Sequence, residues 1–117
     1  MLDRSAAWLV EIDDAIINIR AYTAGFDRAR FLNDKIVQDA VLMRLIVIGE
    51  SARLLDGAAR AEAPEIDWGK VAAFRNRAAH GYRSIDFAIV WGIVTHELEP
   101  LAGAVRRMLA ARGEAMP

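Results

Sequence analysis

The residues that could do chemistry gather in one stretch of eight, from Arg75 to Tyr82. This stretch holds His80, one of only two histidines in the chain, five residues after the guanidinium of Arg75. Histidine can move protons near neutral pH, and arginine can hold a phosphate through two parallel hydrogen bonds. The pair could therefore cleave or bind a phosphodiester without a metal ion. Asn76, which follows Arg75 directly, could be a simple helix-surface residue.

The charge around these residues is unlike that of the whole chain. The formal net charge is −1, which argues against a general nucleic-acid coat. From Trp68 to Ile85, however, no acidic residue occurs, and the basic residues are Lys70, Arg75, Arg77 and Arg83. A compact basic patch suits a local phosphate contact, which makes Arg77 and Arg83 candidates for contacts with phosphate or RNA. The alternative is that these residues are solvated surface charges.

Composition excludes several classes of protein. A length of 117 residues predicts one domain, residues 1–117. Cysteine is absent and histidine is scarce, so we expect no disulfide, no metal site and no other cofactor. The longest apolar run, residues 40–49, is interrupted by Arg44 and is too short to span a bilayer. No signal peptide is recognisable, so we expect a soluble cytoplasmic protein without a membrane partner.

Periodicity predicts an all-α fold. Ala, Leu, Arg and Glu are frequent, prolines are few, and no alternating strand pattern stands out. The expected helices span about 5–24, 34–55, 68–80 and 84–112, with short helical turns near 27–32 and 57–65. In the first helix the apolar stripe is Leu9, Ile12, Ile16 and Ile19, and Asp13 is expected to lie off it.

The elements around the motif set how Arg75 and His80 relate. Asp67 is a suitable N-cap, and Gly81 is the expected end of the helix that carries the motif. Five residues of regular helix correspond to a rotation of about 140°, so Arg75 and His80 would not share a face. Either the helix ends early and His80 turns toward Arg75, or a second subunit brings its own pair to the same cleft. In the last helix, Pro100 should produce a kink or a break.

The middle of the second long helix is apolar on nearly every side, which predicts burial on nearly every side. One small bundle cannot easily cover all of it, so a dimer interface is the natural second cover. The alternative is a simple central core helix. Arg44, inside this run, either extends to the edge of the apolar surface or pairs with an acid.

Several segments in order, over roughly Asp13 to Leu109, resemble the HepT toxin family of the HEPN ribonuclease superfamily. The matching segments are 19–23, 31–32, 38–41, 48–52, 64–68, 74–76, 80–82 and 89–91. The spacing of Arg75, His80 and Tyr82 resembles the motif of this superfamily. The chain departs from the family at Arg44, where a small polar residue is common, and at Gly81, where an acid is common.

The resemblance implies an all-α, antiparallel, HEPN-like bundle of four to five helices that forms a homodimer with the two motifs in one cleft. It also implies the toxin of a toxin–antitoxin pair, acting as a metal-independent endoribonuclease on RNA such as tRNA or mRNA. His80 would be the general acid or base for attack by the RNA 2′-hydroxyl. Arg75 would stabilise charge on the phosphate in the transition state, with Asn76 in support.

The resemblance implies a second role for Tyr82. HepT-like toxins are paired with MntA-like nucleotidyltransferase antitoxins, and the motif tyrosine is the expected acceptor of AMP. An AMP group two residues from His80 would add charge and bulk that exclude RNA. The alternative for Tyr82 is packing at the bundle edge. The alternative for the whole chain is a non-catalytic helical module that binds a nucleotidyltransferase or nucleotides.

Overall fold

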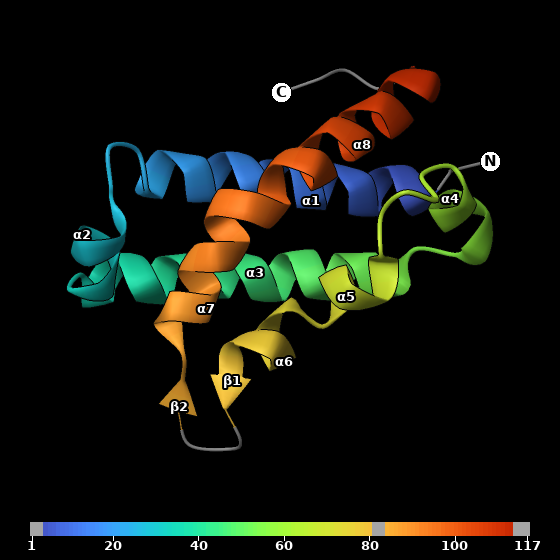
Figure 1. Ribbon diagram of the computed structural model, residues 1–117. Coiled ribbons are helices and arrows are strands. Elements are labelled where there is room, and N and C mark those ends of the chain that lie inside the picture. The colour runs from blue at the N-terminus through green and yellow to red at the C-terminus, as the bar shows by residue number, and fades with distance from the viewer. Residues whose placement is uncertain (1–3, 81–83, 114–117) are drawn as a thin grey trace.

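Two long helices lie side by side in opposite directions and carry the rest of the chain (Figure 1). The computed structural model describes residues 4–80 and 84–113. The long helices are α1 (Arg4–Tyr22) and α3 (Lys35–Leu54), joined by the short α2 (Arg28–Leu32). After α3 come α4 (Gly57–Ala61), α5 (Trp68–Ala72), α6 (Phe74–Ala78), β1 (Ala79–His80), β2 (Ser84–Ile85), α7 (Phe87–Gly92), the π-helical turn η1 (Ile93–Glu97) and α8 (Leu98–Ala111). The prediction of an all-α fold is confirmed.

The first helix forms as its periodicity predicts. The stripe residues Leu9, Ile12, Ile16 and Ile19 are all buried against α3 and α8. The chain then turns at Gly25, which has a φ of 77° that suits glycine. The expectation that Asp13 lies off the buried stripe is wrong. Asp13 is 0% exposed, because α8 crosses α1 and places Arg106 Nε 3.3 Å from its carboxylate.

The second long helix is only partly covered. Asp34 caps its first turn by accepting from the N–H of Val37, and Val41, Leu45 and Ile48 face the core. Its outer side remains open. Ile36 is 83% exposed and Met43 is 56% exposed. Together with the exposed Leu54 they form one stripe of α3. Met43 follows Ile36 by seven residues and Leu54 follows Met43 by eleven, and both spacings are close to whole numbers of helical turns. In the single chain, one side of α3 is therefore open to solvent.

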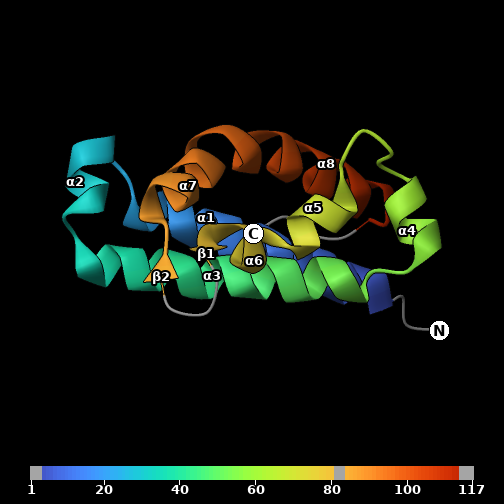
Figure 2. The same ribbon diagram turned by 60° about the horizontal axis from the view of Figure 1, so that its bottom comes forward.

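The helix expected over residues 68–80 is divided in two. Asp67 caps α5 as predicted, by accepting from the N–H of Lys70. The helix then breaks at Ala73, and α6 starts at Phe74. The break lies beside a close approach of α3, since a Cβ on Gly49 would be 2.9 Å from the carbonyl oxygen of Ala72. Figure 2 shows α5 and α6 resting against α3.

The last expected helix is divided as well, as the position of Pro100 predicts. Asp86 caps α7 by accepting from the N–H of Ala88. The turn η1 then widens to the π form before α8 begins at Leu98. Pro100 lacks the N–H that would bond one turn back, so the regular ladder is interrupted here. The described residues thus form more helices than the four to five expected. The reason is that two long predicted helices are each broken by tertiary contacts or proline.

A two-stranded hairpin, absent from the prediction, joins α6 to α7. Its register pairs Ala79 with Ile85 and His80 with Ser84 in antiparallel fashion. Each strand has only two residues, which is too short for the alternation of apolar and polar residues that identifies a strand in a sequence. Within residues 4–80 and 84–113, no helix is both long and apolar enough to cross a membrane.

Candidate active site

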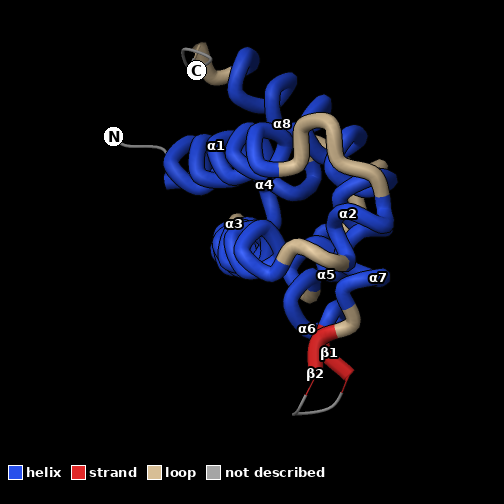
Figure 3. The backbone as a smooth tube through the Cα atoms, turned by 90° about the vertical axis from the view of Figure 1, so that its left-hand side faces the viewer, coloured by secondary structure: helices blue, strands red, loops and turns tan. Residues whose placement is uncertain are grey.

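The motif lies where α6 gives way to the hairpin. The helix ends at Ala78, and Ala79 has an extended backbone with φ −89° and ψ 130°. His80 therefore leaves the helical path, which corresponds to the first of the two alternatives left open by the sequence. Figure 3 shows that β1 and β2 project away from the helical bundle. The motif thus begins on the bundle and continues outward along the base of a hairpin.

The base of this hairpin is tied to the bundle by backbone and side-chain hydrogen bonds. The N–H of Asp86 donates to the carbonyl of Ala78 over 2.7 Å. The carboxylate of Asp86 also caps α7, accepting from Ala88 at 2.9 Å. One residue therefore connects the end of the motif helix to the start of α7. This connection sets where β1 leaves the bundle and hence where the backbone of His80 lies.

Arg75 and Asn76 face solvent on α6. Both are exposed, while Phe74 and Ala78 on the same helix are buried in the core. Within residues 4–80 and 84–113, the side chains of Arg75 and Asn76 make no hydrogen bond or ion pair with another residue. The Arg75 guanidinium is thus open to an anionic ligand such as a phosphate, which it can bind through two hydrogen bonds.

Two other basic residues of the stretch, Lys70 and Arg77, form ion pairs with the same acid, Glu97. The Oε1 atom of Glu97 lies 2.8 Å from Nη1 of Arg77 and 3.1 Å from Nζ of Lys70. Glu97 comes from η1, twenty residues beyond Arg77. Sequence reasoning missed Glu97, because the acid-free stretch ends before it and no local spacing relates it to Lys70 or Arg77. The ion pair also competes with the phosphate contact predicted for Arg77.

The environment of Glu97 keeps it ionised at neutral pH. Its side chain is 23% exposed, and this burial raises the pKa of the Glu97 carboxyl. The hydrogen bonds from Arg77 and Lys70 act in the opposite direction and outweigh the burial, so the pKa lies below the ordinary glutamate value. Lys70, Arg77 and Glu97 therefore form a cluster of two cations and one carboxylate.

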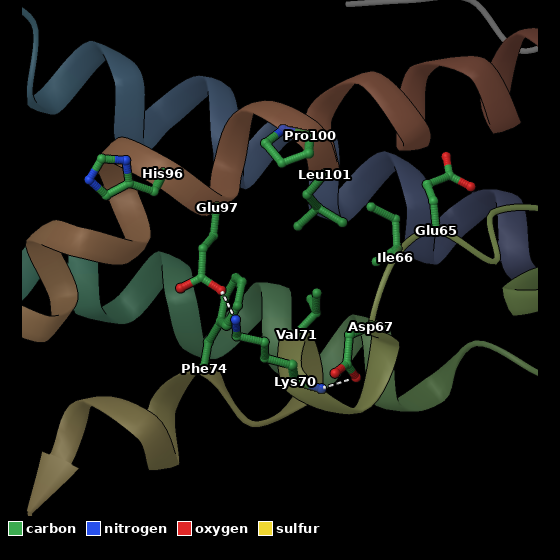
Figure 4. Close-up of a pocket in the computed structure, with 10 residues that line it drawn as sticks. All are labelled: Glu65, Ile66, Asp67, Lys70, Val71, Phe74, His96, Glu97, Pro100 and Leu101. Atoms are coloured by element: carbon green, nitrogen blue, oxygen red, sulfur yellow. Dashed lines mark hydrogen bonds and ion pairs between the residues drawn. The ribbon is translucent and has the colours of Figure 1, made fainter.

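A pocket of about 260 Å³ opens beside this cluster, between α5 and the η1–α8 segment (Figure 4). Its floor is apolar, with contributions from Val71, Phe74 and Leu101. Its rim carries His96 and Glu97. Arg75 is not among the described residues that line this pocket, whereas Phe74, its neighbour on α6, is.

Part of the predicted site lies outside the described residues. Gly81, Tyr82 and Arg83 fall in the gap between residues 80 and 84, and so does the predicted helix stop at Gly81. For His80 the structure describes the backbone in β1. The described part brings together Arg75, Asn76 and the backbone of His80 within one short helix and the strand that follows it.

The fold and the motif define a class of protein. It is an all-α bundle with an exposed arginine on α6 and a histidine five residues later, after that helix ends. A family model described as Ribonuclease HepT-like matches residues 12–108. The chain belongs to this HepT-like ribonuclease family, which confirms the resemblance inferred from its sequence segments.

Individual relatives agree with the family match. The "Probable ribonuclease HepT" of Thermococcus cleftensis is 30% identical over 101 residues, covering 86% of this chain and 92% of that protein. The "Putative RNase MJ1380" of Methanocaldococcus jannaschii is 29% identical over 92 residues, covering 79% of this chain and 84% of that protein. The "Putative RNase MJ0127" of the same organism is 32% identical over 92 residues, covering 79% of this chain and 76% of that protein. No solved structure matches the chain significantly.

Proposed function

We propose that this protein is an endoribonuclease that cleaves RNA without a metal ion and acts as the toxin of a toxin–antitoxin pair. The observation that carries the proposal is the open guanidinium of Arg75 on α6, directly before the point where His80 enters the hairpin. Support comes from the ribonuclease family model, which matches residues 12–108, a range that includes both residues.

The chemistry follows from the residue types. The 2′-oxygen of one ribose attacks the adjacent phosphorus, and the bond from phosphorus to the 5′-oxygen of the next nucleotide breaks. His80 acts as general base for the 2′-hydroxyl proton or as general acid for the leaving 5′-oxygen. Arg75 stabilises the negative charge that builds up on the phosphoryl oxygens, and Asn76 supports the phosphate by a hydrogen bond. The products are a 2′,3′-cyclic phosphate and a 5′-hydroxyl.

A homodimer is part of the proposal. The exposed stripe of α3, with Ile36 83% and Met43 56% exposed, is an apolar surface that water contacts in the single chain. Burying such a stripe against a second copy is favourable. The second copy also supplies a second Arg75 and His80, so one RNA segment can be held by groups from both subunits.

Regulation by AMP transfer is the last part of the proposal. An MntA-like nucleotidyltransferase antitoxin would transfer AMP from ATP to the hydroxyl of Tyr82: the new bond joins the tyrosine oxygen to the α-phosphorus, and pyrophosphate leaves. The added phosphate brings negative charge two residues from His80 and the adenosine adds bulk, and both exclude RNA from the motif. Removal of the modification would restore cleavage.

The test is cleavage of tRNA and total cellular RNA by the purified protein in excess EDTA. We expect the wild type to cut, and His80→Ala and Arg75→Ala to lose about 100-fold or more in rate. Arg28→Ala, which removes an exposed arginine from α2, is the matched control and should cut normally. Mass spectrometry first establishes that the protein carries no AMP on Tyr82. Failure of AMP-free wild type to cut would sink the nuclease proposal and favour a non-catalytic module that binds a nucleotidyltransferase or nucleotides.

A further inference from the structure

The motif helix α6 is too short to be stable by itself, so its orientation depends on contacts with the rest of the chain. It has five residues, and its N-cap residue, Ala73, makes no side-chain capping bond. An isolated helix of this length is not stable in water, so packing against the rest of the chain must set its orientation. On its apolar side, Phe74 and Ala78 are buried. On its polar side, among the described residues, Arg77 provides the side-chain hydrogen bond to another element.

That hydrogen bond ends on Glu97, which is well placed to act as an anchor. The distance from Nη1 of Arg77 to Oε1 of Glu97 is 2.8 Å, and Lys70 of α5 reaches the same oxygen at 3.1 Å. The side chains of Arg77 and Glu97 are 30% and 23% exposed, so water screens this pair less than an ordinary surface pair. One carboxylate thus holds α5 and α6 to the segment that follows the hairpin.

The backbone at Glu97 is itself unusual. Glu97 is the last residue of η1, where the helix widens to the π form before Pro100. A π-helical turn holds one residue more than an α-helical turn, so it changes the direction in which the next side chains point. Such turns are frequent at functional sites. Here the π-helical turn η1 includes Glu97, the residue that pairs with Arg77 of α6.

We propose that Glu97 is a positioning residue for RNA cleavage and acts through Arg77. By fixing Arg77, it fixes the rotation of the single turn of helix that also carries Arg75 and Asn76, and the point at which the chain leaves toward His80. It also pairs with Arg77, so the unpaired positive charge of α6 is that of Arg75. This inference rests on the proposed ribonuclease function. It means that Arg77 serves as the partner of Glu97 and does not contact RNA.

The first measurement compares Glu97→Ala and Glu97→Gln with Glu99→Ala. Glu99, two residues away, is an exposed glutamate with an arginine partner on another helix, Arg20, and it serves as the matched control. We expect Glu97→Ala to lower kcat about 10- to 100-fold while KM changes less than about twofold, because a misplaced group reacts slowly although RNA still binds. Glu97→Gln should fall between Ala and wild type, since its amide oxygen still accepts a hydrogen bond. Glu99→Ala should match the wild type.

A double-mutant cycle separates positioning from RNA contact. If Arg77 acts through Glu97, then Arg77→Gln, Glu97→Ala and the double variant should lose similar factors in kcat, and the losses should not multiply. If Arg77 instead binds RNA directly, Arg77→Gln should raise KM while Glu97→Ala leaves kcat intact. That second outcome would overturn the inference.

The failure of this inference is distinguishable from failure of the ribonuclease proposal. Wild type that does not cut RNA in EDTA overturns the ribonuclease function, and the cleavage role of Glu97 with it. Wild type that cuts, with Glu97→Ala cutting equally well, overturns only the role of Glu97. Thermal unfolding of each variant is measured beside the kinetics. If Glu97→Ala proves unfolded, the Gln variant and the Arg77→Gln variant decide the outcome by the same kcat criterion.

Discussion

Gly49 of α3 and Ala72 of α5 are in such close contact that a Cβ on the glycine would lie 2.9 Å from the alanine carbonyl oxygen. This contact involves backbone, so the neighbour cannot move aside as a flexible side chain would. It lies directly before Ala73, where the motif-bearing segment breaks into α5 and α6. The absence of a side chain at residue 49 therefore determines how near the motif helix lies to the centre of the bundle.

The first prediction follows from this contact. Gly49→Ala should lower the free energy of unfolding by about 1–3 kcal/mol, because the added methyl group forces α3 and α5 apart. Gly103→Ala on α8 is the control, since a Cβ there meets nothing within 4 Å. It should be neutral or stabilising by up to about 1 kcal/mol, the usual helix preference for alanine. Urea unfolding of both variants tests this, and equal stabilities would contradict it.

The second prediction concerns the buried carboxylate of Asp13. Arg106 Nε lies 3.3 Å from its Oδ1 atom, while Oδ2 is buried with no partner in the described part of the chain. Arg106→Gln should lower the unfolding free energy by about 1–3 kcal/mol, because it leaves a buried charged acceptor without its partner. The neighbour Arg107 pairs with the exposed Glu65, and Arg107→Gln should cost less than about 1 kcal/mol. Thermal or urea unfolding gives both values, and a reversed order would refute the prediction.

The third prediction is a pH dependence at Glu97. Its pKa is lowered in the folded protein, so the folded state binds fewer protons at this site than the unfolded state does. The resulting stabilisation is complete above the ordinary glutamate pKa and is lost as the pH falls through the lower, folded value. At pH 7, Glu97→Gln should therefore be less stable than wild type by about 1–2 kcal/mol. The difference should shrink in acid, as measured by urea unfolding across pH, and a constant difference would rule out this origin.

The fourth prediction tests the open stripe of α3 as a dimer interface. Met43→Glu places a charge in the middle of this stripe and should convert the protein from dimer to monomer, because burying an unpaired charge is unfavourable. Light scattering coupled to size exclusion gives the mass directly. Ala110→Glu, at an exposed position on α8, is the control and should remain a dimer. A wild type that is monomeric at micromolar concentration would remove the basis for a stable homodimer.

Much of the fold is readable from local sequence. The stripe from Leu9 to Ile19 predicts α1, and Asp67 is a predicted cap after which the structure begins α5 at the next residue. The start predicted near residue 34 agrees with α3, which begins at Lys35. These features depend on neighbours within one or two turns, where periodicity and capping are decisive. The division of the last helix before Pro100 was predicted on the same local grounds. The chemical motif itself is also contiguous in sequence.

Other features depend on residues far apart in the chain. The burial of Asp13 depends on Arg106, and the break at Ala73 lies beside Gly49. The occupation of Arg77 depends on Glu97. No short-range pattern encodes such partnerships, because they arise only when the helices pack. For this reason the basic stretch looked like one patch in sequence, although Glu97 pairs with two of its described cations.

The sequence by itself determined the helical class, the positions of the long helices and the motif residues Arg75 and His80, because each is set by local preference or by residue type. Only the tertiary structure decided that Arg75 is open while Arg77 is held by Glu97. It also decided that the chain leaves the helix at Ala79 into a hairpin fixed by Asp86. These features arise from contacts between segments that meet only after the bundle has formed.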